Sequence, residues 1–109
     1  MLTRDRRLSA RALREARWRR ERKTPFFVVR WTDHIGTPGR YAVSVPLRVS
    51  KSAPARNRLR RLMFAALRMC APQRGPDAIF AMFPKALTAT PEELELAVKG
   101  CIEQTTSHP

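Results

Sequence analysis

Apolar residues recur at helical spacing in the middle of the chain, which predicts a helix from Ala53 to about Cys70. Ser52 precedes this stretch as a suitable N-cap, and Pro54 is tolerated in a first helical turn. Pro72 follows and ends the segment. Six apolar residues fall at i, i+3, i+4, i+7, i+8 and i+11 and form one buried stripe: Leu59, Leu62, Met63, Ala66, Leu67 and Cys70.

Two further helices are predicted, one at each end of the chain. Residues 8–23 contain few apolar residues, but these lie near helical spacing, and Pro25 ends the segment. At the other end, Thr90 and Pro91 followed by two glutamates are typical of a helix N-terminus, because the hydroxyl caps the helix and carboxylates favour its positive end. This helix is expected to run to about Gln104, with four residues pointing inward: Leu94, Val98, Cys101 and Ile102.

Three stretches have the composition of β-strands, namely residues 26–31, 40–49 and 77–83. Residues 32–39 have the composition of a turn. Pro46 lacks an amide donor, so it is expected to mark an edge, a bulge or a break into a third short strand. Alternation divides the first strand into a face with Phe27, Val29 and Trp31 and an opposite face with Phe26, Val28 and Arg30.

The predicted order of elements is therefore α-β-β-β-α-β-α. This order predicts an α/β fold, arranged as an α+β sandwich around a small central sheet. A length of 109 residues fits one domain, so residues 1–109 are expected to fold as a single unit. With 43% hydrophobic residues the chain can bury a core.

Basic residues outnumber acidic ones, and they are concentrated in one part of the chain. There are 22 Lys and Arg against 9 Asp and Glu, a net charge of +13. Residues 1–74 hold 20 of the basic residues and four of the acidic ones, whereas residues 75–109 are net acidic. This asymmetry indicates that one region binds a polyanion. RNA is the favoured polyanion, because most of the cations are arginines, whose guanidinium groups fork onto phosphates and stack on bases.

The densest basic run coincides with the start of the central predicted helix. No acidic residue lies between Asp33 and Asp77 to neutralise it. Like charges at i,i+4, such as Arg56 and Arg60, cost about a few tenths of a kcal/mol, and a bound polyphosphate removes that repulsion. Asn57 can donate and accept hydrogen bonds at a base edge or a sugar hydroxyl. The candidate RNA-binding residues are Arg48, Lys51, Arg56, Asn57, Arg58, Arg60 and Arg61.

Catalytic and membrane functions are disfavoured by the same composition. A self-sufficient nuclease needs clustered carboxylates or histidine bases, and the acidic residues here are scattered. Two cysteines cannot make a zinc site by themselves, and two histidines leave little material for a metal centre. Both Cys70 and Cys101 fit core positions of helices. No apolar run approaches the about 20 residues of a membrane span. Catalytic and metal-binding residues are therefore not expected in this chain.

Short motifs occur in a characteristic order along the chain. The most specific is Ser50-Lys51-Ser52-Ala53 followed by Arg56-Asn57-Arg58 and Arg60-Arg61. Weaker motifs are Arg7-Leu8-Ser9, Thr24-Pro25-Phe26-Phe27, and Asp77 at the start of a strand that ends at Pro84. Together they closely resemble the protein subunit of bacterial ribonuclease P. The sequence departs from that family at Leu47, Phe64 and Phe83, where basic residues are usual.

This resemblance implies one α/β domain with a left-handed β-α-β crossover. It further implies that the Arg-Asn-Arg helix binds the catalytic RNA, and that a cleft between the sheet and the first helix binds the 5′ leader of precursor tRNA. The RNA would perform the Mg²⁺-dependent hydrolysis and bind most of the Mg²⁺, while the protein assists substrate and metal binding. The leader cleft would contain Trp18, Val28 and Arg30.

The leading hypothesis is thus a non-catalytic, RNA-binding subunit of ribonuclease P, with the catalytic RNA and the leader as partners. No obligate protein partner and no membrane is expected. A cytoplasmic location is expected as well, because the charged N-terminus has no apolar core typical of a secretory signal. The alternative is a structural RNA-binding protein, such as a ribosome component, which binds ribosomal RNA without affecting tRNA maturation.

Overall fold

The computed structural model describes residues 6–33, 39–71 and 75–107. Residues 34–38 of the predicted turn lie outside this part of the chain. Within the described part the elements follow the predicted order α-β-β-β-α-β-α, with a short 3₁₀ helix before the last α-helix, but one of the three strands before the central helix is residues 20–23 and not a strand after Pro46. The elements are α1 (Ala10–Glu15), β1 (Arg20–Lys23), β2 (Phe27–Trp31), β3 (Tyr41–Ser44), α2 (Ala53–Cys70), β4 (Ala78–Met82), the 3₁₀ helix η2 (Pro84–Thr88) and α3 (Pro91–Ser107).

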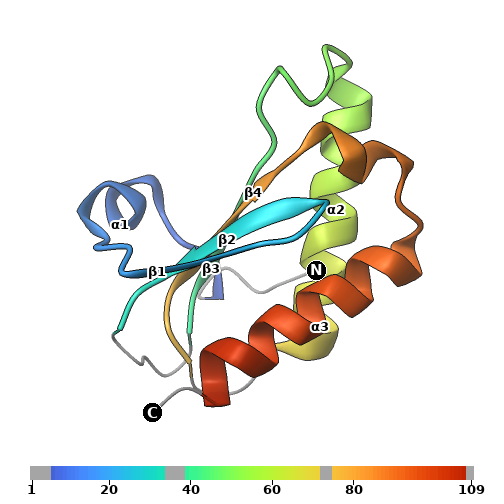
Figure 1. The fold of residues 1–109 in the computed structure, drawn as a ribbon. Coiled ribbons are helices and arrows are strands. Elements are labelled where there is room, and N and C mark those ends of the chain that lie inside the picture. Colours follow the sequence, from blue (N-terminus) through green and yellow to red (C-terminus); the bar gives the residue numbers. More distant parts are fainter. Residues whose placement is uncertain (1–5, 34–38, 72–74, 108–109) are drawn as a thin grey trace.

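The strands form one mixed sheet in the order β1-β2-β4-β3 (Figure 1). β1 pairs antiparallel with β2, and β2 pairs antiparallel with β4. β3 and β4 are parallel neighbours, with Tyr41 opposite Ala78. Parallel neighbours need a crossover connection, and α2 provides it. The β-α-β unit is thereby confirmed, and the left-handed sense that the resemblance implies stays a prediction.

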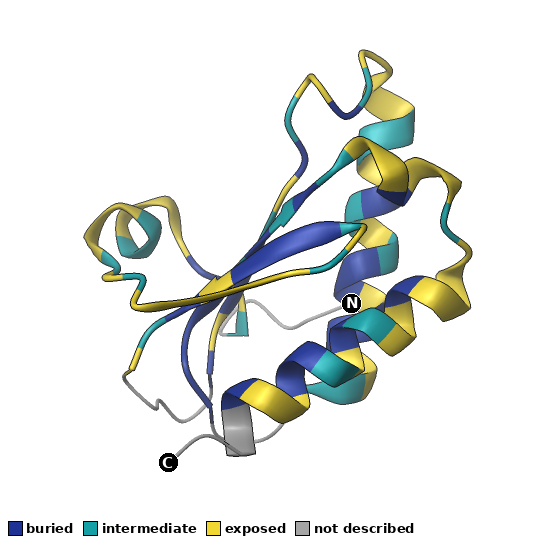
Figure 2. Ribbon diagram, in the orientation of Figure 1, coloured by how far each residue is buried: buried dark blue, intermediate teal, exposed yellow. Residues whose placement is uncertain are grey.

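One face of the sheet packs against α2 and α3, and α1 lies on the other side (Figure 1). Phe27, Val29 and Phe80 on the helix-covered face are completely buried. The rings of Phe27 and Phe80 meet edge to face, with centroids 5.2 Å apart. Figure 2 shows the buried positions concentrated on the strands other than β1 and on the sides of α2 and α3 that face them. The predicted core face of β2, formed by Phe27, Val29 and Trp31, is confirmed.

The central helix α2 begins and ends where the apolar pattern predicts. The Ser52 hydroxyl accepts a hydrogen bond from the Ala55 N–H at 3.2 Å, as expected of an N-cap. Most of the predicted stripe is buried, and Leu62 and Cys70 at its margin are half-buried. Phe64 is buried in addition, although the stripe did not include it. The helix therefore buries a wider face than the six-residue pattern indicates.

The last helix, α3, is confirmed and reaches Ser107, three residues beyond the predicted end. Thr90 and Glu93 form a capping box, in which the Glu93 N–H donates to the Thr90 hydroxyl at 3.1 Å and the Thr90 N–H donates to the Glu93 carboxylate at 2.9 Å. The described part of the chain has no helix that is long and apolar enough to cross a membrane. The predicted inward residues are all buried: Leu94, Val98, Cys101 and Ile102.

The predicted helix over residues 8–23 is wrong beyond Glu15. α1 has 6 residues, and Arg20–Lys23 form the edge strand β1 instead. The arginine-rich second half of this segment has no apolar stripe that a helix could bury, so tertiary partners decide its conformation. In the strand, three charged side chains each find a partner: Arg20 with Asp33 at 3.2 Å, Glu21 with Arg30 at 2.9 Å, and Arg22 with Gln104 at 2.8 Å.

The strand predicted over residues 40–49 is also too long. β3 ends at Ser44, and a turn follows in which the Val49 N–H donates to the Pro46 carbonyl at 3.0 Å. The third short strand that was one of the options after Pro46 does not form. Val45 and Val49 are buried in the core, so this stretch gains more by turning inward toward α2 than by extending the sheet. Phe26 was expected on the face opposite to Phe27, but it lies just before β2 and packs against the core.

The N-terminal segment lies along the outer edge of β3. The Leu8 N–H donates to the Tyr41 carbonyl at 2.8 Å, and Arg7 forms a parallel β-bridge with Tyr41. Arg6 Nε donates to the Gly39 carbonyl at 2.9 Å. A Cβ atom at Gly39 would lie 2.8 Å from the Gly75 carbonyl oxygen, so a side chain at this position would push the two segments apart. These contacts fix the backbone of Arg7 close to α2.

Candidate RNA interface

Basic side chains occupy the exposed side of α2 and the segment that leads into it. Helical periodicity directs Leu59 and Met63 into the core and leaves Arg58 and Arg61 exposed on other sides of the helix. Arg56 and Arg60 are half-buried at the margin. The seven residues predicted from the sequence lie on the first half of α2 or in the segment just before it, and all are exposed or half-buried: Arg48, Lys51, Arg56, Asn57, Arg58, Arg60 and Arg61.

The cations of α2 have no carboxylate partner within residues 6–33, 39–71 and 75–107. The N-terminus of a helix adds roughly half an elementary positive charge to the same region. The start of α2 is therefore an uncompensated positive surface of the kind that a phosphate backbone neutralises. The ion pairs of the described residues lie elsewhere, between Arg11 and Glu15, Arg20 and Asp33, Arg30 and Glu21, and Arg40 and Asp77.

Two arginines of this region are held by hydrogen bonds. Arg56 Nη1 donates to the Ser50 carbonyl at 2.7 Å and ties the lead-in segment to the helix. Arg60 Nη1 donates to Asn57 Oδ1 at 2.7 Å. This bond uses the amide oxygen of Asn57, so the two N–H donors of its amide nitrogen remain for a ligand. Arg58 and Arg61 make no comparable contact with the described residues, which leaves their guanidinium groups for an external anion.

The N-terminal segment contributes one more arginine to this region. Arg7 lies over the ring of Phe64, with its Cζ atom 6.0 Å from the ring centroid. Arg7, Asn57, Arg60, Arg61 and Phe64 line a hollow of about 240 Å³, which we call the Arg7–Phe64 hollow. The Arg7-Leu8-Ser9 motif singled out Arg7 in the sequence. The position of Arg7 beside α2 could not be predicted, because it depends on the long-range pairing of the N-terminal segment with β3.

The residues predicted for the leader cleft lie on or near the sheet face that α2 and α3 leave open. Val28 and Arg30 alternate with the core residues of β2, so they point to this open face as predicted. Arg30 Nε contacts a Glu21 carboxylate oxygen at 2.9 Å, which offsets part of its charge. Val28 is only 6% exposed. Trp18 is half-buried between α1 and β1, outside any helix.

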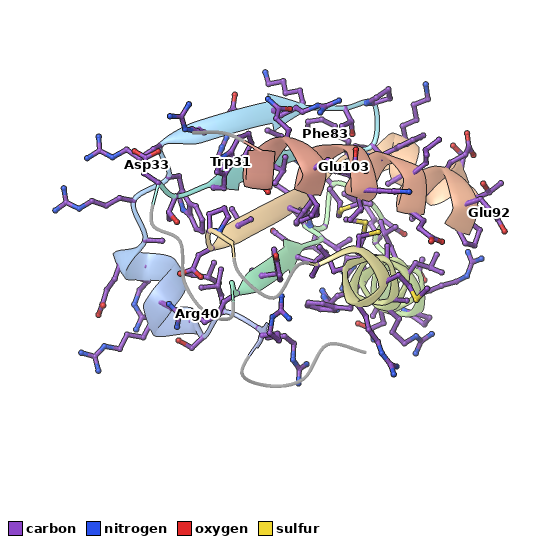
Figure 3. The ribbon with its side chains drawn as sticks, turned by 90° about the horizontal axis from the view of Figure 1, so that it is seen from below. Trp31, Asp33, Arg40, Phe83, Glu92 and Glu103 are labelled. Atoms are coloured by element: carbon purple, nitrogen blue, oxygen red, sulfur yellow. The ribbon has the colours of Figure 1, made fainter. Side chains whose placement is uncertain are left out.

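A larger hollow of about 510 Å³ opens between α1 and the ends of the strands. Figure 3 shows two of its lining residues, Asp33 and Arg40, on the side of the molecule where α1 lies. Arg40 Nη2 contacts an Asp77 carboxylate oxygen at 2.9 Å, and the Arg40 N–H donates to the other at 3.0 Å. Both aspartates are thus engaged by arginines. Arg17 and Arg19 are the lining cations that these pairs leave available.

The side chains of the described residues are suited to binding a ligand rather than to holding a metal ion or attacking a substrate. Among them, no group of three His, Cys, Asp or Glu side chains is placed to hold a metal ion. Burial raises the pKa of the Cys70 and Cys101 thiols, so both stay protonated at neutral pH and are poor nucleophiles. Burial also raises the pKa of Tyr41, more than the nearby Arg6 lowers it. The region can hold phosphates, donate hydrogen bonds and stack on planar groups.

Both the sequence and the fold are similar to those of known proteins. A family model described as Ribonuclease P matches residues 2–106. The fold is similar to that of a Staphylococcus aureus RNase P protein mutant with defective mRNA degradation activity, with a TM-score of 0.74 and 15% identity over 94% of this chain and 89% of that chain. Another S. aureus RNase P protein structure gives a TM-score of 0.53 and 19% identity over 80% and 77% of the two chains. Among curated proteins, none matches this sequence.

Proposed function

The chain belongs to the ribonuclease P family, and we propose that it binds the catalytic RNA of that enzyme through the basic side of α2. As a ribonuclease P protein it has a role in tRNA processing. In this proposal the RNA cleaves the precursor tRNA and the protein increases affinity for the substrate. In the same proposal, none of the residues that the structure describes acts as a catalytic residue.

The observation that carries the proposal is the unneutralised basic surface of α2. Arg58 and Arg61 are exposed and have no partner in the described residues, while Arg56 and Arg60 are oriented by Ser50 and Asn57. A protein that is basic only for solubility has no need to place four arginines within six residues of one helix without a carboxylate between them. Binding of RNA phosphates relieves the repulsion among these cations and releases the counterions condensed on the RNA.

The 5′ leader of precursor tRNA is proposed to bind on the open face of the sheet and in the hollow beside α1. Arg30 and Trp18 lie on this side, and Arg17 and Arg19 supply cations for its phosphates. The lining residues support a continuous path for RNA around the β3 edge. Arg7 and Phe64 line both the Arg7–Phe64 hollow and a neighbouring one, and that neighbour shares Ser9 with the hollow beside α1.

Magnesium is assigned to the RNA in this proposal. The described residues of the protein do not fit a magnesium site of their own, because their carboxylates are dispersed and four of them are in ion pairs with arginines. The cations of this chain would neutralise phosphates near the magnesium sites of the RNA. In this way they would help the RNA to fold at low Mg²⁺.

We expect the protein to bind its cognate ribonuclease P RNA with a steep dependence on monovalent salt. If the five basic residues of positions 51–61 each neutralise one phosphate, the slope of log affinity against log salt is about −4, from about −0.7 to −0.9 per phosphate. Filter binding over a salt series measures this slope. Affinity that does not change with salt would contradict the proposal. Tighter binding to ribosomal RNA than to ribonuclease P RNA would favour the ribosomal alternative.

A further inference from the structure

The Arg7–Phe64 hollow differs from the rest of the α2 surface because it combines planar and apolar walls with positive charge. Phe64 contributes an aromatic ring that is 8% exposed and otherwise packed in the core. Arg7 lies over that ring with a planar guanidinium group. Asn57, Arg60 and Arg61 complete the lining. A phosphate alone needs only the cations and gains nothing from an aromatic wall.

The hollow is held in shape by contacts from two directions. On one side, the β-bridge of Arg7 with Tyr41 and the Leu8–Tyr41 hydrogen bond anchor the N-terminal segment to the sheet. On the other side, burial of Phe64 against the core fixes its ring. Such pre-organisation lowers the entropy that ligand binding would otherwise cost.

The polar group at the hollow has a defined orientation as well. Asn57 Oδ1 accepts from Arg60 Nη1 at 2.7 Å, which leaves the Asn57 amide N–H groups as donors. A ligand that fits is therefore planar and aromatic, carries a hydrogen-bond acceptor at its edge, and is attached to negative charge for Arg61. The hollow has a volume of about 240 Å³.

These features describe a nucleotide, and we propose that the Arg7–Phe64 hollow binds one unpaired base of the RNA that α2 contacts. The inference rests on the proposed function and adds a stacking site to it. The base packs against the Arg7 guanidinium and the Phe64 ring, an acceptor on its edge takes a hydrogen bond from Asn57, and Arg61 contacts the adjoining phosphate. The base must be unpaired, because in a duplex both its faces are stacked and its edge is engaged.

The test distinguishes binding of nucleobases from binding of the phosphate backbone. The probes are a single-stranded RNA decamer of mixed sequence and a decamer in which every nucleotide is an abasic tetrahydrofuran phosphate of equal charge. We expect the full-length protein to bind the base-bearing decamer about fivefold to a hundredfold more tightly, because stacking of one base on a protein contributes about 1–3 kcal/mol. Phe64→Leu and Arg7→Lys are each expected to reduce this preference at least about threefold. Arg7→Lys keeps the charge and should therefore leave the salt slope unchanged.

Two control variants exclude trivial explanations. Phe80→Leu changes another buried phenylalanine that does not line the hollow, and should leave the preference for bases intact. Arg58→Gln, also outside the hollow, should weaken binding of both decamers alike. Equal affinity of the unaltered protein for both decamers, with steep salt dependence retained, would overturn the stacking site while the proposed function stands. Failure to bind either decamer at low salt would contradict both.

Discussion

Replacing Arg58 and Arg61 together by glutamine is expected to change the magnitude of the salt slope of RNA binding from about 4 to about 2.4, since each side chain neutralises about one phosphate and contributes about 0.8 to the slope. These two arginines are exposed and have no carboxylate partner in the described part of the chain, so their loss breaks no ion pair there. The affinity at fixed low salt should fall at least about tenfold, which is a loss of about 1.4 kcal/mol. Filter binding with the cognate ribonuclease P RNA measures both quantities.

The matched control removes the same charge from the acidic part of the chain. Lys85 and Lys99 are exposed on η2 and α3, and Lys85→Gln with Lys99→Gln lowers the net charge by the same amount. If the slope depends on net charge alone, both double variants will behave alike, and the assignment of the interface to α2 is then wrong. A slope that changes only with Arg58 and Arg61 locates the interface on α2.

Phe27→Ala is expected to destabilise the fold by about 3–5 kcal/mol, the range for removing a large side chain from a packed core. Phe27 is completely buried, and its ring packs edge to face against Phe80 with centroids 5.2 Å apart. Domains of this size are stable by only about 5–15 kcal/mol, so the variant should lose a large part of its free energy of unfolding. Urea denaturation followed by circular dichroism measures the loss.

Leu96→Ala is the matched control for that measurement. Leu96 lies on α3 and is 72% exposed, so truncating it removes little buried apolar area and should change stability by no more than about 0.5 kcal/mol. A loss at Phe27 that is no greater than the loss at Leu96 would mean that the core does not lie between the sheet and the two long helices.

Elements with a strong apolar pattern could be predicted from the sequence alone. α2 combines an N-cap serine, a proline in its first turn and a long apolar stripe, and α3 combines a capping box with four inward residues. In both helices the local signals agree with what the fold requires. The alternation along β2 likewise identified which face is buried, because Phe27, Val29 and Trp31 contact the helices.

The N-terminal region could not be predicted in the same way. β1 consists entirely of charged residues, and its conformation depends on partners such as Asp33 and Gln104 that are distant in sequence. Local propensity contains no information about those contacts. The same limitation applies to β3, which ends early because Val45 and Val49 turn into the core.

The part of the candidate RNA interface that lies on α2 could be predicted from the sequence. The basic residues around Arg58 could be identified because a single helix presents them, and the absence of acidic neighbours is visible in the sequence. The position of Arg7 over Phe64 could not be predicted from the sequence, because a β-bridge to Tyr41 brings Arg7 there. The burial of Phe64 in the core was likewise visible only in the fold.

The central claim is that this chain assists the RNA of ribonuclease P, and the most direct test is cleavage of precursor tRNA by the cognate RNA at low Mg²⁺, with and without the protein. We predict that the protein strongly accelerates cleavage, and that the Arg58→Gln and Arg61→Gln double variant accelerates it far less, while the Lys85→Gln and Lys99→Gln variant behaves like the unaltered protein. No acceleration by the folded, unaltered protein would contradict the account.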